Sequence, residues 1–361
     1  MKLPSTRLTM QQVAEQLELS RMTVSSVING LARERGVKKE TELRVREFLK
    51  TIGYVPSIYA RRLRKKEAPT IGVLHAGFLM SHLLEAYNML TNELVSHENA
   101  VDIVALPRPE SREGLEDFVG RGVPALLWIQ NAKESAIQHE RIDDLFPYLA
   151  QFGKVVIYNH SPAPAPIEAR MDELGIHRIV IDRPAAYRIA ATFLAGLGHK
   201  VLALPDVEAG TLKDMRGREA AIFRAAGIDS VFGLLESGEE TMIDRSAASG
   251  RLYAERLVEA VRGKKVTAAW IFDDEIAGYT LGRLAELGVR VPHDLTLLGF
   301  DGLAIGAAFA PPLTTIAVPV ADMVSRVSSI LNPSGSGSGP LTHVFQPTLL
   351  ERSSHAPARQ A

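Results

Sequence analysis

The sequence predicts a small all-α domain of helix-turn-helix type at the N-terminus, followed by a larger α/β domain with two lobes. Apolar residues repeat at helical spacing before residue 56, whereas from Thr70 onward short apolar runs alternate with amphipathic stretches, as in βαβ units. The two parts also differ in charge. With 361 residues, 46% of them hydrophobic, the chain is long enough for two or three well-packed globular units.

The charge difference separates the first 66 residues from the rest of the chain. They hold 15 Lys and Arg against six Asp and Glu, a formal charge of +9, whereas the whole chain has a charge of −1 and the remainder therefore −10. A basic head before an acidic body is typical of nucleic-acid binding. A solvated surface or a membrane-surface patch would carry the same charge, so the residue pattern has to decide.

Two short helices are expected at the start of the basic head. Thr9 and Gln12 make a capping-box start for a helix over about residues 10–17. Ser20 caps a second helix, which ends at Asn29-Gly30. The apolar faces are Met10, Val13, Ala14 and Leu17 in the first helix and Val24, Val27 and Ile28 in the second. Two short helices joined by a tight turn form a helix-turn-helix motif, whose second helix enters a DNA major groove.

A third helix completes the head, and a basic segment follows it. The helix runs from about Thr41 and stops at Gly53, with Pro56 beyond. It buries Val45, Phe48, Leu49 and Ile52, which the two shorter helices need as a common core. Five of the ten residues 57–66 are cationic, which by itself is typical of a basic linker.

The body alternates strands and helices, as a parallel sheet requires. Strands are expected at 70–74, 101–106, 125–129, 155–158, 178–182, 201–204, 231–235, 268–272 and 295–300. Helices are expected at about 83–97, 184–196, 216–226, 247–261 and 275–287. A proline-rich break at residues 161–166 follows the fourth strand, so residues 68–160 and 167–313 are interpreted as two similar lobes.

Several motifs occur in a characteristic order. Those of the head are Val13-Ala14, Ser20-x-x-Thr23-Val24-Ser25-x-Val27-x-Asn29-Gly30, Gly53-Tyr54-x-Pro56, Ala60-Arg61-x-Leu63 and Thr70-Ile71-Gly72-Val73. Those of the body are Leu197-Gly198-His199, Trp270-Ile271-Phe272-Asp273-Asp274, Gly288-x-x-Val291-Pro292-x-Asp294, Gly299-Phe300-Asp301 and Pro311-Pro312-Leu313-Thr314-Thr315-Ile316. In order and spacing they resemble the LacI/GalR family of transcriptional regulators. The resemblance covers almost the whole chain and is weakest in the first lobe.

The resemblance implies a domain organisation. It comprises a DNA-binding headpiece over residues 1–56, a hinge segment with a hinge helix over 57–67, a periplasmic-binding-protein-like (type I) effector-binding and dimerisation domain over 68–355, and a tail over 356–361. The first lobe is expected at about 68–160 and 318–335, the second at about 161–313 and 340–355. The chain would return to the first lobe through a helix at about 320–331, and a last strand near 343–346 would rejoin the second. Residues 333–340 are interpreted as a flexible link.

The resemblance also implies a DNA-binding surface. In the recognition helix, residues 20–29, Arg21 and Met22 take the positions that face base edges. Arg21 can donate two hydrogen bonds to guanine, worth about 1–3 kcal/mol of discrimination, whereas Met22 offers apolar contact only. Leu63 is the residue that would enter the minor groove. The expected contacts are Thr9, Ser20, Arg21, Met22, Thr23, Ser25, Ser26, Asn29, Tyr54, Ala60, Arg61 and Leu63; Ser26 is equally compatible with the core.

An effector site is expected where strands end, because ligands of open α/β folds bind beyond the carboxyl ends of strands. Carboxylates there suit hydroxyl-rich ligands. The expected contacts are His75, Phe78, Ser81, Arg218, Asp273, Asp274 and Asp301. Alternatives remain: Asp273 or Asp274 can cap the next helix, Phe78 can cover the hinge between lobes, and Arg216 rivals Arg218. The first-lobe loop lacks acidic and Asn-rich character, so the effector is expected to be unusual or absent.

Other function classes lack a signature. No zinc spacing, phosphate-binding loop or Gly-x-Ser-x-Gly elbow occurs, so neither a metal, a cofactor nor an enzyme activity is expected. The absence of cysteine fits a reducing compartment, and without a signal-peptide or transmembrane pattern a cytoplasmic protein is expected. No leucine heptad is present near the C-terminus, which favours a dimer over a tetramer.

The sequence therefore predicts a transcription regulator, a repressor in the simplest interpretation. It would bind a near-palindromic double-stranded DNA operator as a homodimer, with affinity modulated by a small-molecule effector such as a sugar. A ligand-independent DNA-binding dimer is the alternative. A two-lobed small-molecule binding protein is disfavoured, because it explains neither the charge of +9 nor the helix-turn-helix spacing.

Overall fold

The structure is a computed structural model of the chain. It describes residues 10–28, 30–53, 70–76, 81–96, 100–106, 112–130, 142–205, 221–234, 247–263, 266–332 and 340–359. By its contacts the chain divides into two units. The first contains Met1–Leu79, Tyr87–Val180 and Val324–His343, and the second contains Met80–Ala86, Ile181–Met323 and Val344–Ala361.

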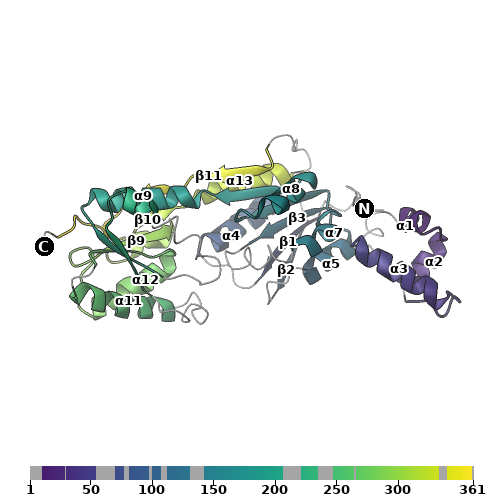
Figure 1. The fold of residues 1–361 in the computed structure, drawn as a ribbon, viewed down its shortest axis with the longest axis horizontal. Coiled ribbons are helices and arrows are strands. Elements are labelled where there is room, and N and C mark those ends of the chain that lie inside the picture. The colour runs from purple at the N-terminus through teal and green to yellow at the C-terminus, as the bar shows by residue number, and fades with distance from the viewer. Residues whose placement is uncertain are drawn as a thin grey trace. The chain divides into compact units, whose positions relative to one another are not determined.

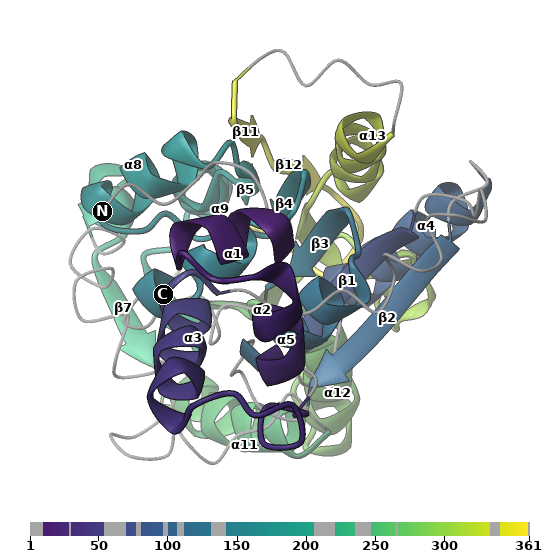
Figure 2. The ribbon, with the colours of Figure 1, turned by 90° about the vertical axis from the view of Figure 1, so that its right-hand side faces the viewer.

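Three helices form the head, as the sequence predicts. They are α1 (Met10–Gln16), α2 (Arg21–Ile28) and α3 (Lys39–Thr51), drawn together in Figure 2. The Ser20 hydroxyl accepts a hydrogen bond from the Thr23 amide at 3.0 Å, so the expected cap of the second helix is confirmed. The core shared by the three helices consists of Val13, Ala14, Leu17, Val24, Val27, Ala32, Val45 and Ile52.

The connection between α2 and α3 is a series of turns over residues 32–36. The buried Ala32 fixes it to the core of the head, and the Val37 amide donates to the Ala32 carbonyl at 2.8 Å. Gly36 adopts a φ of 68°, which residues with a side chain rarely take. The third helix begins at Lys39, two residues before the expected Thr41, and Gly53 ends it with a φ of 60°.

The first unit is built on a six-stranded sheet in the order β11-β5-β4-β3-β1-β2. Strands β1, β2, β3 and β11 are labelled in Figure 1, and β4 and β5 are labelled as well in Figure 2. Its strands are β1 (Thr70–Ala76), β2 (Ala100–Leu106), β3 (Ala125–Ile129), β4 (Lys154–Tyr158), β5 (His177–Ile181) and β11 (Thr342–Phe345). Neighbouring strands from β2 to β5 are parallel. The helices are α4 (Ser81–Ser96), α5 (Arg112–Arg121), η3 (Ile142–Asp144), α7 (Phe146–Leu149), α8 (Ala165–Glu173) and α13 (Val320–Leu331), of which α4 and α13 extend into both units.

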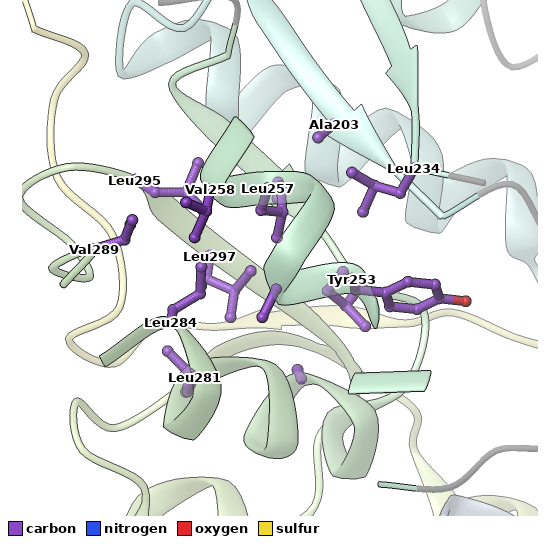
Figure 3. Close-up of a cluster of buried hydrophobic side chains, with 14 of the residues drawn as sticks. Ala203, Leu234, Tyr253, Leu257, Val258, Leu281, Leu284, Val289, Leu295 and Leu297 are labelled. Atoms are coloured by element: carbon purple, nitrogen blue, oxygen red, sulfur yellow. The ribbon is translucent and has the colours of Figure 1, made fainter. Parts of the chain in front are cut away.

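The second unit contains another six-stranded sheet, in the order β12-β10-β9-β8-β6-β7. Its strands are β6 (Val201–Leu204), β7 (Ser230–Gly233), β8 (Ala268–Trp270), β9 (Thr296–Asp301), β10 (Thr314–Ala317) and β12 (Thr348–Leu350), and β12 is antiparallel to β10. The helices are α9 (Arg183–Gly196), α11 (Ala247–Arg262), α12 (Asp274–Glu286) and η4 (Ala304–Ala308). Figure 3 shows Leu257 of α11, Leu284 of α12 and Leu297 of β9 within one apolar cluster.

Two expected strand assignments are wrong. The strand expected at 178–182 was placed in the second lobe, but β5 pairs with β4 in the first sheet. The strand expected near 343–346 was also placed in the second lobe, but β11 lies beside β5, and it is β12 that joins the second sheet. The misassignment of the strand at 178–182 arose from the interpretation of residues 161–166. Their prolines start helix α8 rather than a linker between lobes, since proline is well tolerated at the first helical positions, and α8 leads the chain back to the first sheet.

Most other elements of the body were expected within one to three residues of their bounds, but several were not expected at all. The unexpected elements are α5, η3, α7, α8, η4, β10 and β12. Of the helix expected at 216–226, the structure describes residues 221–226, of which 221–225 are helical. The expected flexible link at 333–340 lies outside the described residues except for Pro340.

The last described residues are attached to the second unit. The Ala358 amide donates to the Leu197 carbonyl at 2.8 Å, and Arg359 Nε donates to the His293 carbonyl at 2.6 Å. Residues 356–359, which were expected as part of a tail, are therefore packed against this unit. In the parts of the chain that the structure describes, no helix has the length and apolar composition needed to cross a membrane.

Candidate DNA-binding surface and effector site

The N-terminal turn of α2 presents two side chains to solvent. Arg21 is exposed, and Met22 is 69% exposed, more than the other large apolar side chains that the structure describes. Both follow the Ser20 cap, whose hydroxyl also lies 2.8 Å from Thr23 Oγ1. Thr23 and Ser25 are half-buried on the same helix. A guanidinium and an apolar side chain next to a helix N-terminus suit base edges and phosphates in a major groove.

Ser26 faces the interior of the head. Its side chain is 2% exposed, and its hydroxyl donates to the Met22 carbonyl at 2.7 Å. The expectation that Ser26 contacts DNA is thus replaced by its alternative, a place in the core. A serine that bonds to the carbonyl four residues earlier has satisfied its hydroxyl within the helix.

Several residues expected at the two sites lie outside the described residues. In the DNA-binding set these are Thr9, Asn29, Tyr54, Ala60, Arg61 and Leu63, and in the effector set Phe78 and Arg218. Ser81 is the first residue of α4, and only its backbone is described.

The two neighbouring aspartates at the start of α12 have different surroundings. Asp273 is the N-cap residue and accepts hydrogen bonds from the amides of Glu275 and Ile276 at 2.9 and 3.0 Å. Asp273 therefore caps α12, which was the alternative role expected from the sequence. A cap still leaves carboxylate lone pairs for a ligand.

Asp274 connects three elements of the second unit. One carboxylate oxygen accepts from Thr315 Oγ1 at 2.7 Å, and the other accepts from the amides of Gly302 and Leu303 at 2.9 and 2.8 Å. Burial and the neighbouring Asp301 raise the pKa of Asp274 to about 7, against the opposing effect of these hydrogen bonds. A side chain at Gly299 would overlap the Asp274 carboxylate, so glycine is required there. Asp274 therefore joins α12, the turn after β9, and β10.

Asp301 ends β9 in a strained backbone conformation. Its φ is 118°, a value that residues with a side chain rarely adopt, and its side chain is buried. The carboxylate lies 2.5 Å from Nδ1 of His82, which is buried on the first turn of α4 and belongs by its contacts to the second unit. Strain of this kind tends to occur at functional sites.

His82 was not among the residues expected from the sequence. The expected residues on this loop, His75, Phe78 and Ser81, stop one position short of it. The signal that was available is a histidine among Leu83, Leu84 and Ala86 near the start of an apolar helix, where a buried polar side chain needs a partner.

Aromatic side chains gather beside these carboxylates, at the carboxyl ends of β8 and β9. The rings of Trp270 and Phe272 lie 4.7 Å apart, and those of Trp270 and Tyr187 lie 4.9 Å apart, both edge to face. Trp270 Nε1 donates to the Gly299 carbonyl at 2.9 Å. Phe272 is half-buried and directly precedes Asp273, and an aromatic ring near a carboxylate suits a sugar or another ring-shaped ligand.

Polar residues also end strands of the first unit. His75 lies near the carboxyl end of β1 and is half-buried. Its ring centroid is 5.5 Å from that of Tyr87. Gln130, Asn159 and His160 follow β3 and β4 and are buried, and Asn159 Nδ2 donates to the Gln130 carbonyl at 2.9 Å. These three residues were not among those expected from the sequence, although the rule that ligands bind beyond strand ends applies to them equally.

The site geometry offers hydrogen bonding rather than metal coordination. Asp273, Asp274 and Asp301 come together at one end of the second sheet, and His75 belongs to the first unit. Within the described residues no group of three or more His, Cys, Asp or Glu side chains is arranged to hold a metal ion.

Two family models match the chain, one in each of its parts. The model described as bacterial regulatory proteins of the lacI family matches residues 9–57, and a periplasmic binding protein-like domain matches residues 191–355.

Curated relatives extend over nearly the full chain. Catabolite control protein A of Priestia megaterium is 24% identical over 325 residues, which cover 87% of this chain and 89% of that protein. The HTH-type transcriptional regulator GalS of Salmonella typhimurium is 24% identical over 367 residues, which cover 97% of each protein.

Solved structures share the fold. The lac repressor dimer bound to operator and the anti-inducer ONPF matches with a TM-score of 0.60 and 20% identity, over 97% of this chain and 99% of that chain. The transcriptional regulator CelR in complex with cellobiose matches with a TM-score of 0.60 and 20% identity, over 96% and 100%.

These matches agree with the order of domains in the structure, a helix-turn-helix head before an α/β body with two parallel sheets. Several relatives that are matched over 86% or more of their length are named as HTH-type transcriptional regulators or repressors. The chain therefore contains a DNA-binding domain of the lacI family followed by a periplasmic binding protein-like domain, which is the domain order of transcription regulators of the LacI/GalR type.

Proposed function

We propose that the protein represses transcription by binding a near-palindromic operator in double-stranded DNA as a homodimer, in the cytoplasm. The two-fold symmetry of such a dimer matches the symmetry of two half-sites. A similar solved structure is described as a repressor dimer bound to operator, which supports this arrangement. The observation that carries the proposal is the exposed pair Arg21 and Met22 on the first turn of a capped α2.

In this proposal the residues of α2 determine the operator sequence. Arg21 reads a guanine, Met22 contacts an apolar base edge, and Thr23 and Ser25 bind phosphates or bases, with Ser20 as the helix cap. The remaining proposed contacts are Thr9, Asn29, Tyr54, Ala60, Arg61 and Leu63. Among them Leu63 enters the minor groove from a hinge helix that forms on DNA.

The proposed effector is a small molecule rich in hydroxyl groups, such as a carbohydrate. Structures with the same fold are described with bound cellobiose and ribose, which supports this class. Asp301 and Asp273 would accept hydrogen bonds from it, and Phe272 would contact its ring. His75, Phe78, Ser81 and Arg218 remain proposed contacts. A coupling of about 1–3 kcal/mol between effector and operator would change DNA affinity by roughly 5–150-fold.

Selection of DNA sites from a random pool by the purified full-length protein tests this function. An enriched two-fold symmetric site, bound with an affinity that falls steeply with salt, is the expected result. If no sequence is enriched and only weak salt-sensitive binding is found, the protein does not act as a sequence-specific regulator under those conditions, and the proposal fails.

A second candidate is a DNA-binding dimer that responds to no ligand. It is favoured by the second unit, where Asp273, Asp274 and Asp301 all have partners within the protein. A thermal-shift screen of sugars, sugar phosphates and nucleobases separates the candidates. A ligand at 100 times its dissociation constant adds about 2.7 kcal/mol to the free energy of unfolding, and a complete lack of response favours the ligand-independent dimer.

A further inference from the structure

The contact between His82 and Asp301 joins residues that are far apart in the chain. The two side chains are 8% and 3% exposed, and 219 positions separate them in the sequence. An ionised carboxylate can only accept hydrogen bonds, so Nδ1 of His82 is the donor in this contact. The first turn of α4 is thereby attached to the end of β9.

The other ring nitrogen of His82 has no hydrogen-bond partner in the part of the chain that the structure describes. This atom, Nε2, is buried. A buried polar atom of this kind has lost its hydration without replacement, which costs free energy. The imidazole is therefore well held on one side and incompletely satisfied on the other, a state that favours exchange for a better partner.

Asp301 also differs from its neighbour Asp274 in what holds it. Two backbone amides and a strand threonine, Thr315, bind Asp274, so its surroundings cannot change without disrupting the second sheet. At Asp301 one partner is the side chain of a helical residue, His82, which can leave by rotation about its side-chain bonds or by a shift of the first turn of α4.

We propose that His82 is a built-in occupant of the effector site. Its imidazole takes the place at Asp301 that a hydrogen-bond donor of the effector takes in the bound protein, so that effector entry and departure of His82 are one exchange. This inference rests on the proposed effector function and adds two features to it: the ligand-free site is closed by the protein itself, and effectors carry an N–H or O–H donor for Asp301. Because the imidazole is attached to the chain, its effective concentration is high and free imidazole does not displace it.

The test uses free imidazole as a probe of the full-length protein. His82→Ala removes the ring and leaves a ring-sized space beside Asp301. Imidazole is expected to raise the Tm of this variant saturably, by about 2–4 °C once it exceeds its dissociation constant about tenfold. The wild-type protein is expected to show no rise at the same concentrations.

Two control variants make the result specific. In His82→Asn the side-chain amide nitrogen replaces Nδ1 as the donor to Asp301, so no response to imidazole is expected. Glu85→Ala changes an exposed residue of the same helix and should behave as the wild-type protein. His82→Ser is measured alongside, because a small polar residue keeps the space if the alanine variant does not fold.

A rise in Tm confined to the alanine or serine variant supports the proposal. A rise of equal size in all proteins, or none in any variant that lacks the ring, overturns it. The change in Tm with imidazole can be measured without knowing the effector. Operator selection with the wild-type protein reports separately on the proposed function, so the two failures can be told apart.

Discussion

Asp273 and Asp274 are adjacent in the sequence and occupy different chemical surroundings. Asp273 caps α12 with its carboxylate near the helix N-terminus, where a negative charge is favoured. Asp274 is fully buried beside Asp301, and its pKa is raised to about 7. Its protonation therefore depends on the folded structure, which gives stability a pH dependence.

Asp274→Asn is expected to change that pH dependence. A carboxyl whose folded-state pKa lies above its unfolded value contributes stability that is present below about pH 4 and is lost as the pH rises through about 7. Asparagine stays neutral and can keep the bonds from Gly302 and Leu303. Relative to wild type, the variant should gain stability between pH 5 and 8, on the order of 2–4 kcal/mol. Denaturant unfolding at several pH values measures this, and parallel curves for both proteins would contradict it.

Arg21→Ala is expected to relax operator specificity at one base pair of each half-site. The exposed guanidinium can bind guanine through two hydrogen bonds, so its loss should cost about 1–3 kcal/mol of discrimination at that position and little elsewhere. Competition binding with single-base operator variants measures it. Arg33→Ala, which removes an exposed cation from the turn after α2, is the matched control. Equal loss of affinity for every sequence would contradict base reading by Arg21.

At the scale of elements, local signals predicted what local interactions decide. Capping residues, glycines and apolar spacing predicted α1, α2 and α3, because each of these helices begins and ends through residues near in the sequence. Sheet membership was predicted wrongly for β5 and β11, since a strand pairs with partners that no local pattern identifies. The same limit applies to His82, whose partner Asp301 lies in another strand-helix repeat.

The β5–β11 pair carries a histidine contact whose stability should depend on pH. Arg326 Nε donates to His343 Nδ1 at 3.2 Å, and His343 Nε2 lies 3.3 Å from Nδ1 of His177. Burial lowers the pKa of His343 to about 4, and the charges of Arg326, His177 and Arg178 add to the effect. Protonated His343 could no longer accept from Arg326.

His343→Asn is expected to reduce the loss of stability at mildly acidic pH. Because the folded-state pKa lies below the ordinary 6.5, His343 contributes stability that is present above about pH 6.5 and is lost as the pH falls toward 4. The loss should be on the order of 1–3 kcal/mol in the wild-type protein. Asparagine keeps an acceptor for Arg326 and does not titrate. Tm measured from pH 7 to pH 4.5 tests this, with His293→Asn, a change in another histidine outside this pair, as control.

At the scale of the whole molecule, the distribution of charge separates two tasks. The first 66 residues carry +9 and the rest −10, so attraction to a polyanion such as DNA is concentrated in the first 66 residues, while the remainder is acidic. The family, the order of domains and the class of function could be predicted from the sequence, because motifs such as Ser20 to Gly30 and Gly299 to Asp301 are local. The hydrogen-bond partners of Asp274 and Asp301 could not be predicted, because these partners lie in distant segments of the chain.

Leu63→Ala is expected to separate specific from non-specific DNA binding. In the proposed mechanism an apolar wedge unstacks a base step at the operator centre, whereas the cations of the head and hinge bind phosphates of any sequence. The variant should therefore lose specific affinity by roughly tenfold or more, a loss of about 1.4 kcal/mol, and retain its non-specific affinity. Salt titrations measure both affinities. The slope of log affinity against log salt concentration should stay unchanged, because no cation is removed. Arg64→Ala, next to it in the chain, should instead reduce that slope; an unchanged ratio of specific to non-specific affinity in Leu63→Ala would mean that Leu63 does not enter the operator.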